Sequence, residues 1–222
     1  MQHPTRRNVE EKPREIGMKR PYFIGIAGGS CSGKTTLAVE LAARLGPDQT
    51  ARIAIDSYYH GLPSTALHDV GTHNFDDPHA LDHELLVSHL GGLSKGRTVD
   101  IPVYDFKSHA RTDCTVRIDP VRFVILEGLF LLYWDDVRSY LGTKVFIDVA
   151  HESCLSRRLE RDTRDRGRSR EEVTRRYHDM ARPMFDKYVH PTLRFADVVV
   201  DGRRPVIDLV AAVVQHIEEA GC

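Results

Sequence analysis

The chain has 222 residues, which is enough to bury a sizeable core in one large domain or in two small ones. Its 31 basic and 32 acidic side chains nearly cancel, so no strong net field points to nucleic acid or to a membrane surface as a partner. No apolar run is long enough to span a bilayer. The 4 cysteines lack C-x-x-C spacing, which argues against a zinc site and a disulfide framework and favours a cytoplasmic protein.

The chain begins with a polar, charged segment, residues 1–20, that lacks the apolar stretch of a signal peptide, so we expect a mobile tail there. We expect residues 21–222 to form a single domain. The apolar run 22–27 predicts a buried strand, and the amphipathic run 36–45 predicts a helix. Between them, residues 28–35 read GGSCSGKT, which fits the pattern G-x-x-x-x-G-K-[ST] of a phosphate-binding loop (P-loop).

The residue types of this loop suit a nucleoside triphosphate. Glycines let the backbone approach the phosphates closely, and the free N–H groups at the start of a helix attract anions. Lys34 is expected to reach the β- and γ-phosphates, and the hydroxyl of Thr35 is expected to ligate Mg²⁺. A chance glycine-rich turn is disfavoured because the strand and the helix flank the pattern on both sides. The residues predicted to hold the nucleotide are Gly28, Gly29, Ser30, Cys31, Ser32, Gly33, Lys34, Thr35 and Thr36.

Further strands and helices alternate along the rest of the chain. Four short apolar runs predict parallel strands that are covered on both faces, and helical patterns separate most of them. The strands are expected at 51–55, 122–126, 144–149 and 196–200, and the helices at 81–93, 152–164, 170–188 and 206–220. This alternation predicts an α/β fold built on a doubly wound parallel sheet. Residues 99–104 and 115–118 predict two antiparallel strands of a small flap, about 97–119, inserted in it.

Acidic side chains close several of the predicted strands, where ligands of open α/β sheets bind. Asp56 follows the run 51–55 and can take a proton from an attacking hydroxyl or hold Mg²⁺ through water; capping of a turn is the alternative. Glu127 follows four apolar residues and is expected to position Mg²⁺ and its waters. Asp148 lies within the run 144–149. These three acids are therefore candidate site residues.

Arginines crowd the segment 157–168. Arg158 and Arg161 are three apart and share a helix face, and guanidinium groups can stabilise the charge on a transferring phosphoryl group. Gly167 permits a hinge, so residues 157–176 are expected to form a closing lid. The two arginines expected instead to be solvated and paired with the interleaved acids are Arg157 and Arg164.

Eight short blocks of the sequence resemble the uridine kinase (uridine–cytidine kinase) family, in order and at comparable spacing between residues 21 and 201. The blocks are IGIAGGS, DSYY, NFDDP, PVYDF, EG, RD, RGR and AD. Several of them are specific to the family, whereas the P-loop is shared by many families.

The resemblance implies a P-loop kinase domain that transfers a phosphoryl group from ATP, with Mg²⁺, to the 5′-hydroxyl of uridine and cytidine. It implies that Asp56 is the base for that hydroxyl and that Lys34 and Arg161 also serve catalysis. It implies that Arg166 and Arg168 belong to the lid and the phosphate side. It also implies a homo-oligomer, with a tetramer as one form.

The resemblance further implies how the acceptor nucleoside is held. Asp76 and Arg158 would bind the ribose hydroxyls. Tyr104 and His109 would read the edge of the base, and the two tautomers of a histidine can serve either O4 of uracil or the amine of cytosine. The residues that would wall the pocket are Tyr59, Phe75 and Phe106.

Three departures from the family pattern bear on the substrate. Arg176, also expected in the acceptor pocket, stands where the family commonly has a glutamine that helps to hold the sugar. It could instead reach a phosphate or carboxylate on a different acceptor. Cys154 and Ala150 replace polar residues before the lid. Cys31 lies inside the P-loop, where the loop amides and Lys34 favour its thiolate, so it is a candidate for oxidation as well as a small filler.

Two rival functions stay open. One is a related small-molecule kinase of the phosphoribulokinase type that acts on another ribosyl compound. The other is a nucleotide-dependent switch that binds nucleotide without an acceptor pocket. The sequence contains no N-K-x-D element of the kind that reads guanine.

Overall fold

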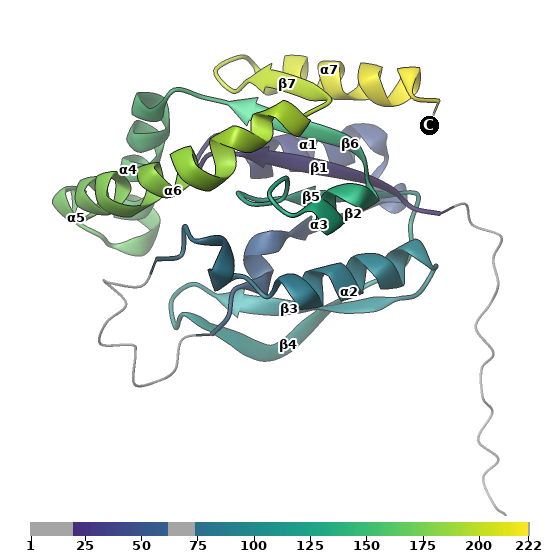
Figure 1. The fold of residues 1–222 in the computed structure, drawn as a ribbon, viewed down its shortest axis with the longest axis horizontal. Coiled ribbons are helices and arrows are strands. Elements are labelled where there is room, and N and C mark those ends of the chain that lie inside the picture. The colour runs from purple at the N-terminus through teal and green to yellow at the C-terminus, as the bar shows by residue number, and fades with distance from the viewer. Residues whose placement is uncertain (1–19, 62–73, 222) are drawn as a thin grey trace, which may run out of the picture.

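A computed structural model describes residues 20–61 and 74–221 of the chain. The tail predicted over residues 1–20 lies, apart from Arg20, outside the described residues. Five parallel strands form the central sheet in the order β2-β5-β1-β6-β7 (Figure 1). The strands are β1 (Tyr22–Gly28), β2 (Thr50–Ala54), β5 (Phe123–Glu127), β6 (Leu141–Asp148) and β7 (Val198–Asp201). Each overlaps a predicted strand, so the apolar runs located all five.

Helices α1 (Lys34–Leu45) and α7 (Val206–Glu219) cover one face of the sheet. Successive side chains of a strand point to opposite faces. In β1, Ile24 and Ile26 are therefore buried with these two helices, while Phe23 belongs to the core on the other face. Because apolar side chains point both ways, the sheet needs a layer of structure on each side, as predicted for a doubly wound α/β fold.

The opposite face is covered by α2 (His83–Ser94), α3 (Asp135–Tyr140) and the antiparallel pair β3 (Val99–Asp105) and β4 (Ala110–Ile118). Figure 1 shows α2 lying alongside this hairpin. The hairpin corresponds to the predicted flap, but its second strand begins five residues before the predicted start because exposed polar residues continue the pairing. The short helix α3 was not predicted.

The segment before β7 is helical for most of its length. α4 (His151–Arg166) ends at Gly167, which has a φ of 64° in the left-handed region that favours glycine. α5 (Arg170–Arg176) then begins after Ser169, whose side chain accepts a hydrogen bond from the backbone N–H of Glu172. Helical turns continue to Phe195, as α6 (Arg182–Met184) between two π-helical segments and a final 3₁₀ segment. The single helix predicted over 170–188 is thus several joined segments.

Three 3₁₀ turns also connect the larger elements, at Pro47–Gln49, Ile55–Tyr58 and Pro78–Ala80. Cys31, Cys114 and Cys154 are free thiols, and Cys222 lies outside the described residues. Within the described ranges, no helix is both long and apolar enough to cross a membrane.

Candidate active site

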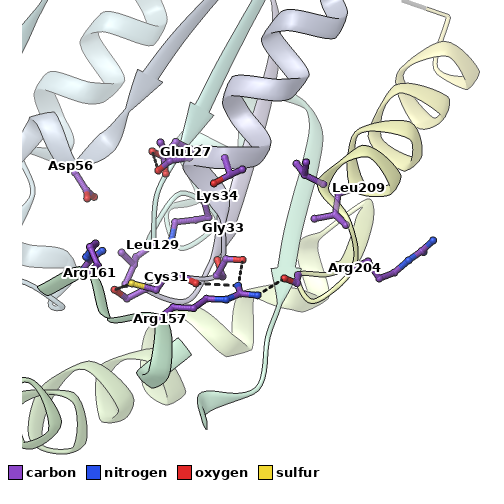
Figure 2. Close-up of a pocket in the computed structure, with 16 residues that line it drawn as sticks. Cys31, Gly33, Lys34, Asp56, Glu127, Leu129, Arg157, Arg161, Arg204 and Leu209 are labelled. Atoms are coloured by element: carbon purple, nitrogen blue, oxygen red, sulfur yellow. Dashed lines mark hydrogen bonds between the residues drawn. The ribbon is translucent and has the colours of Figure 1, made fainter. Parts of the chain in front are cut away.

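A pocket of about 500 Å³ opens at the carboxyl ends of the parallel strands (Figure 2). It is lined by residues 30–36 of the P-loop and α1, by Asp56 after β2, by Glu127 at the end of β5, and by Arg157 and Arg161 of α4. Parallel pairing places Glu127 level with β1 and β2, so strands distant in sequence deliver their ends to one place. The predicted phosphate loop and the predicted acids therefore share one pocket.

The P-loop runs directly from β1 into α1. Gly28 and Gly33 have φ values of 146° and 105°, and a Cβ on Gly28 would lie 2.6 Å from the carbonyl oxygen of Ile147. Lys34 is buried, and its Nζ donates to the carbonyl oxygen of Gly29 at 2.8 Å. No side chain of the described chain caps the N-terminus of α1 at Gly33. The backbone N–H groups there are available for an anion.

Two oxygen ligands suited to a magnesium ion lie at the mouth of this loop. The hydroxyl of Thr35 donates to Oε1 of Glu127 at 2.8 Å. Mg²⁺ prefers hard oxygen donors and commonly takes only one or two from the protein, with water and substrate phosphates completing its shell. The described residues contain no group of three histidine, cysteine, aspartate or glutamate side chains arranged around a metal. As two oxygen donors beside the phosphate loop, Thr35 and Glu127 fit a magnesium site of the phosphate-bound kind.

Asp56 lies in the 3₁₀ turn that follows β2. Burial, together with the charge of Glu127, raises the pKa of its carboxyl from 3.8 to about 6, and the charge of Lys34 opposes the shift. A base with a pKa near the working pH is effective, because it is ionised yet still accepts a proton readily. This position suits general-base chemistry.

A second pocket adjoins the first across shared walls. Both are lined by Ser30, Asp56, Leu129 and Arg161. The second pocket encloses about 80 Å³, and it shares further lining residues with an open cavity of about 700 Å³. Except for Tyr104, every residue predicted to bind the acceptor lines it. These residues are Asp56, Tyr59, Phe75, Asp76, Phe106, His109, Arg158, Arg161 and Arg176.

Aromatic rings make one wall of this second pocket. Phe75 stacks on His109 with centroids 5.0 Å apart, and it meets Tyr59 edge-on at 5.6 Å. Tyr104 lies behind them, buried against Tyr59 and Phe106 at 5.5 and 5.2 Å. Its hydroxyl is buried and finds no hydrogen-bond partner in the described chain. Flat apolar faces beside an unsatisfied donor suit a planar base with polar edges.

Asp162 organises the arginines of α4, a role that the sequence reasoning missed. Its buried carboxylate accepts a hydrogen bond of 2.8 Å from Nε of Arg161 and lies 3.7 Å from Nε of Arg158. Arg166 and Arg168 approach it at 3.5 Å. Burial would raise the pKa of this carboxyl, but the hydrogen bond from Arg161 and the surrounding positive charges hold it below its ordinary value. One buried anion thus gathers four cations.

This arrangement differs in part from the predictions. Arg166 and Arg168 line the second pocket and not the P-loop pocket, because they face Asp162. Arg158 approaches Oδ2 of Asp76 at 3.6 Å, as expected if the two act on one ligand group. Two nitrogens of Arg158, Nε and Nη1, lack hydrogen-bond partners within the described ranges. The hydroxyl of a ligand could accept hydrogen bonds from these two nitrogens.

Arg176 is buried on the wall of the second pocket, with Nη1 3.9 Å from Oε1 of Glu172. Burial, together with the charge of Arg168, lowers the pKa of its guanidinium. Arg176 thus lines the pocket in which it was expected from the sequence. Cys154 is buried in a small cluster with Tyr177.

The two arginines expected to be solvated behave differently. Arg164 is exposed and pairs with the neighbouring Asp165 at 2.7 Å, as predicted. Arg157 is exposed, as predicted, but its hydrogen bonds run to backbone carbonyls and not to the interleaved acids. Its guanidinium contacts the backbone of the P-loop, with Nη1 3.3 Å from the carbonyl oxygen of Ser32. A charged residue on a helix gives no sign in the sequence that it will meet a loop more than a hundred residues away.

The far wall of the P-loop pocket was also missed. It is made by Gly202, Arg204, Val206 and Leu209, from the connection between β7 and α7 and the first turns of α7. Figure 2 shows Leu209 and Arg204 across the pocket from Asp56. The signal available was their position after the last parallel strand, the edge at which ligands bind.

Comparison with known proteins agrees with this geometry. The sequence matches the profile of the phosphoribulokinase / uridine kinase family over residues 23–208. A uridine kinase of Chloroflexus aggregans is 42% identical over 195 residues, which are 86% of this chain and 93% of that protein. The uridine-cytidine kinase B of Dictyostelium discoideum is 38% identical over 199 residues, covering 90% of this chain and 82% of that protein.

Solved structures extend the likeness of the fold. The phosphoribulokinase from Rhodobacter spheroides matches with a TM-score of 0.60 at 14% identity, covering 85% of this chain and 74% of that one. At that identity the match concerns the fold alone.

Proposed function

Because the chain belongs to the phosphoribulokinase / uridine kinase family, we propose that it is a kinase that transfers the γ-phosphoryl group of ATP to the 5′-hydroxyl of uridine and cytidine. The observation that carries the proposal is the position of Asp56, on the wall common to the P-loop pocket and the acceptor pocket. A base for phosphoryl transfer must meet the acceptor hydroxyl beside the terminal phosphate, and a shared wall is where both ligands come within its reach.

The acceptor is proposed to bind with its ribose at Asp76 and Arg158 and its base among the aromatic side chains. A carboxylate can accept from two vicinal hydroxyls at once, which suits Asp76. Asp56 takes the proton of the 5′-hydroxyl as its oxygen bonds to phosphorus, and the bond from that phosphorus to the departing diphosphate breaks. Lys34 and Arg161 stabilise the negative charge that spreads over the transferring group.

The base-reading residues are proposed to be Tyr104 and His109. The buried Tyr104 hydroxyl would gain a partner from a polar edge of the base. His109 stacks on Phe75 at the tip of the hairpin, with a φ of 52° that is uncommon for a residue other than glycine. Because either tautomer of a histidine can pair with the edge of the base, we expect both uridine and cytidine to be accepted.

Magnesium is proposed to bind at Thr35 and Glu127. When bound, the ion neutralises phosphate charge and helps to orient the donor. The hydrogen bond from Thr35 to Glu127 keeps both oxygens together at the mouth of the P-loop. This pairing supports the role.

The proposal extends to the assembly and location of the protein. We infer that the protein forms a homo-oligomer, of which a tetramer is one candidate. Its location is inferred to be cytoplasmic. We also infer that the hairpin over 97–119 and the segment 157–176 act as flap and lid of a single domain. Sedimentation velocity would report the oligomeric state directly.

The decisive experiment measures ADP release with a panel of acceptors: uridine, cytidine, ribulose 5-phosphate and no acceptor. Turnover with the two nucleosides supports the proposal. Turnover with the sugar phosphate alone would favour the phosphoribulokinase-type rival. The observation that supports this rival is the buried guanidinium of Arg176 in the acceptor pocket, which could bind a phosphate. Nucleotide binding without turnover by any acceptor would favour a nucleotide-dependent switch.

A further inference from the structure

Arg157 joins three backbone carbonyls that border the P-loop pocket. Its Nη1 donates to the carbonyl oxygens of Cys31 at 3.4 Å and Ser32 at 3.3 Å, and its Nη2 donates to that of Gly202 at 3.0 Å. Figure 2 shows these bonds as dashed lines fanning from one guanidinium. The side chain comes from α4, so three separate parts of the chain meet at it.

We propose that Arg157 is a positioning residue that holds the P-loop in the conformation that receives the donor phosphates. The inference rests on the proposed function only in that the P-loop binds a nucleoside triphosphate. It does not depend on which acceptor the protein uses. Arg157 is assigned no contact with the phosphates themselves.

The peptide planes of the loop explain the effect. In a trans peptide the carbonyl and the following N–H point in opposite directions. Holding the carbonyl of Ser32 toward Arg157 therefore turns the N–H of Gly33 the other way, and both Gly33 and Arg157 line the pocket. Cys31 has a φ of 62°, which is uncommon for a residue other than glycine, so an outside bond to its carbonyl helps to hold it there.

Gly33 faces open space in the direction that a side chain would take. A Cβ added at this residue would meet nothing within 4 Å. Side-chain packing at Gly33 therefore gives its backbone no restraint, and hydrogen bonds to the two preceding carbonyls can supply one. Arg157 supplies both hydrogen bonds from a single side chain.

Gly202, the residue that Arg157 joins to the P-loop, is held in place by the sheet. The N–H of Gly202 donates to the carbonyl oxygen of Asp148 in β6 at 2.9 Å. A Cβ at Gly202 would lie 2.8 Å from the carbonyl oxygen of Ser32 and closer still to Ile147, so its backbone packs directly on the P-loop. Arg157 therefore ties the loop to a fixed point of the sheet.

The geometry requires a guanidinium and not merely a positive charge. An arginine presents a rigid fork of donors, and here Nη1 and Nη2 serve different segments. A lysine has one compact ammonium and cannot hold both segments in the same way. The variant Arg157→Lys therefore keeps the positive charge but loses the simultaneous hydrogen bonds to the two segments.

The test uses the full-length protein with Arg157→Gln, Arg157→Lys and the matched control Arg164→Gln. Arg164 lies on the same helix, has a side chain 68% exposed and pairs with its neighbour Asp165. Its replacement by glutamine removes the same positive charge from α4 without touching the P-loop. Binding of a fluorescent ATP analogue is titrated without acceptor. KM and kcat for ATP, KM for uridine and Tm are then measured.

Both Arg157 variants should bind the analogue about tenfold more weakly, whereas Arg164→Gln should stay within about twofold of the unaltered protein. KM for ATP should rise with little change in kcat or in KM for uridine, and Tm should stay within about 2 °C. These results would separate loop positioning from a general loss of structure.

Equal binding by Arg157→Gln and Arg164→Gln would overturn the inference, and so would normal binding by Arg157→Lys. If the unaltered protein binds the analogue but phosphorylates no nucleoside, the proposed function fails while the binding data still decide the role of Arg157. Failure of the unaltered protein to bind the analogue would reject both.

Discussion

Replacing Asp56 by asparagine should make the ligand-free protein more stable at neutral pH while it removes most of the activity. The two effects share one cause. The site keeps a carboxyl in a buried position beside Glu127, where its ionised form is disfavoured. Asparagine has nearly the same shape and no charge, so it escapes this cost but cannot take a proton from the acceptor.

The magnitude follows from the pKa. Burial and Glu127 raise the pKa of Asp56 from 3.8 to about 6. Each pH unit corresponds to about 1.4 kcal/mol, so ionised Asp56 lowers the free energy of unfolding by about 3 kcal/mol at neutral pH. Loss of the proton acceptor should lower kcat by about 10²- to 10⁴-fold at pH 8.

The sign of the pH dependence is fixed by the direction of this shift. Between pH 3.8 and about 6 the folded protein holds a proton on Asp56 that the unfolded chain has released, so the free energy of unfolding falls as pH rises. Below this window both states are protonated, and above it the whole cost is present. The gain from Asp56→Asn should therefore be near zero at about pH 3.5 and about 3 kcal/mol at about pH 8.

Urea unfolding of both proteins across this pH range measures the difference directly. Asp113→Asn, an exposed acid on β4, is the control for a change of charge alone. The activity of the unaltered protein, as kcat/KM for uridine, should fall below about pH 6 as Asp56 takes up its proton. A gain in stability that does not grow with pH would refute the electrostatic reasoning, and near-normal turnover would remove Asp56 as the base.

Three further changes test other parts of the site. Tyr104→Phe should stabilise the ligand-free protein by about 1 kcal/mol, because it removes a buried unpartnered hydroxyl, and should raise KM for uridine; denaturation and kinetics together check this. Thr35→Ala should raise the Mg²⁺ concentration for half-maximal activity about tenfold, and chelation should abolish activity in both proteins. Arg158→Gln should raise KM for uridine at least about tenfold without changing KM for ATP; unchanged uridine kinetics would remove Arg158 from the acceptor site.

The sheet and the P-loop could be predicted because their signals are local. Each parallel strand is a short apolar run that must be buried on both faces, and the P-loop needs its glycines, Lys34 and Thr35 in consecutive positions. The acids Asp56 and Glu127 were found by the same reasoning, since parallel strands end at one edge. The acceptor residues, by contrast, depended on resemblance, because Asp76 and His109 give no chemical signal alone.

The sequence by itself therefore determined which segments form the sheet and which loop binds phosphate, since a buried strand or a glycine-rich turn is specified by its own neighbours. The tertiary structure alone decided that Asp162 gathers four arginines, that Arg157 turns to the P-loop and that Leu209 closes the far wall. Those roles arise when α4 and α7 pack near the carboxyl edge of the sheet. Contacts between segments so far apart in the chain depend on packing, which no local pattern encodes.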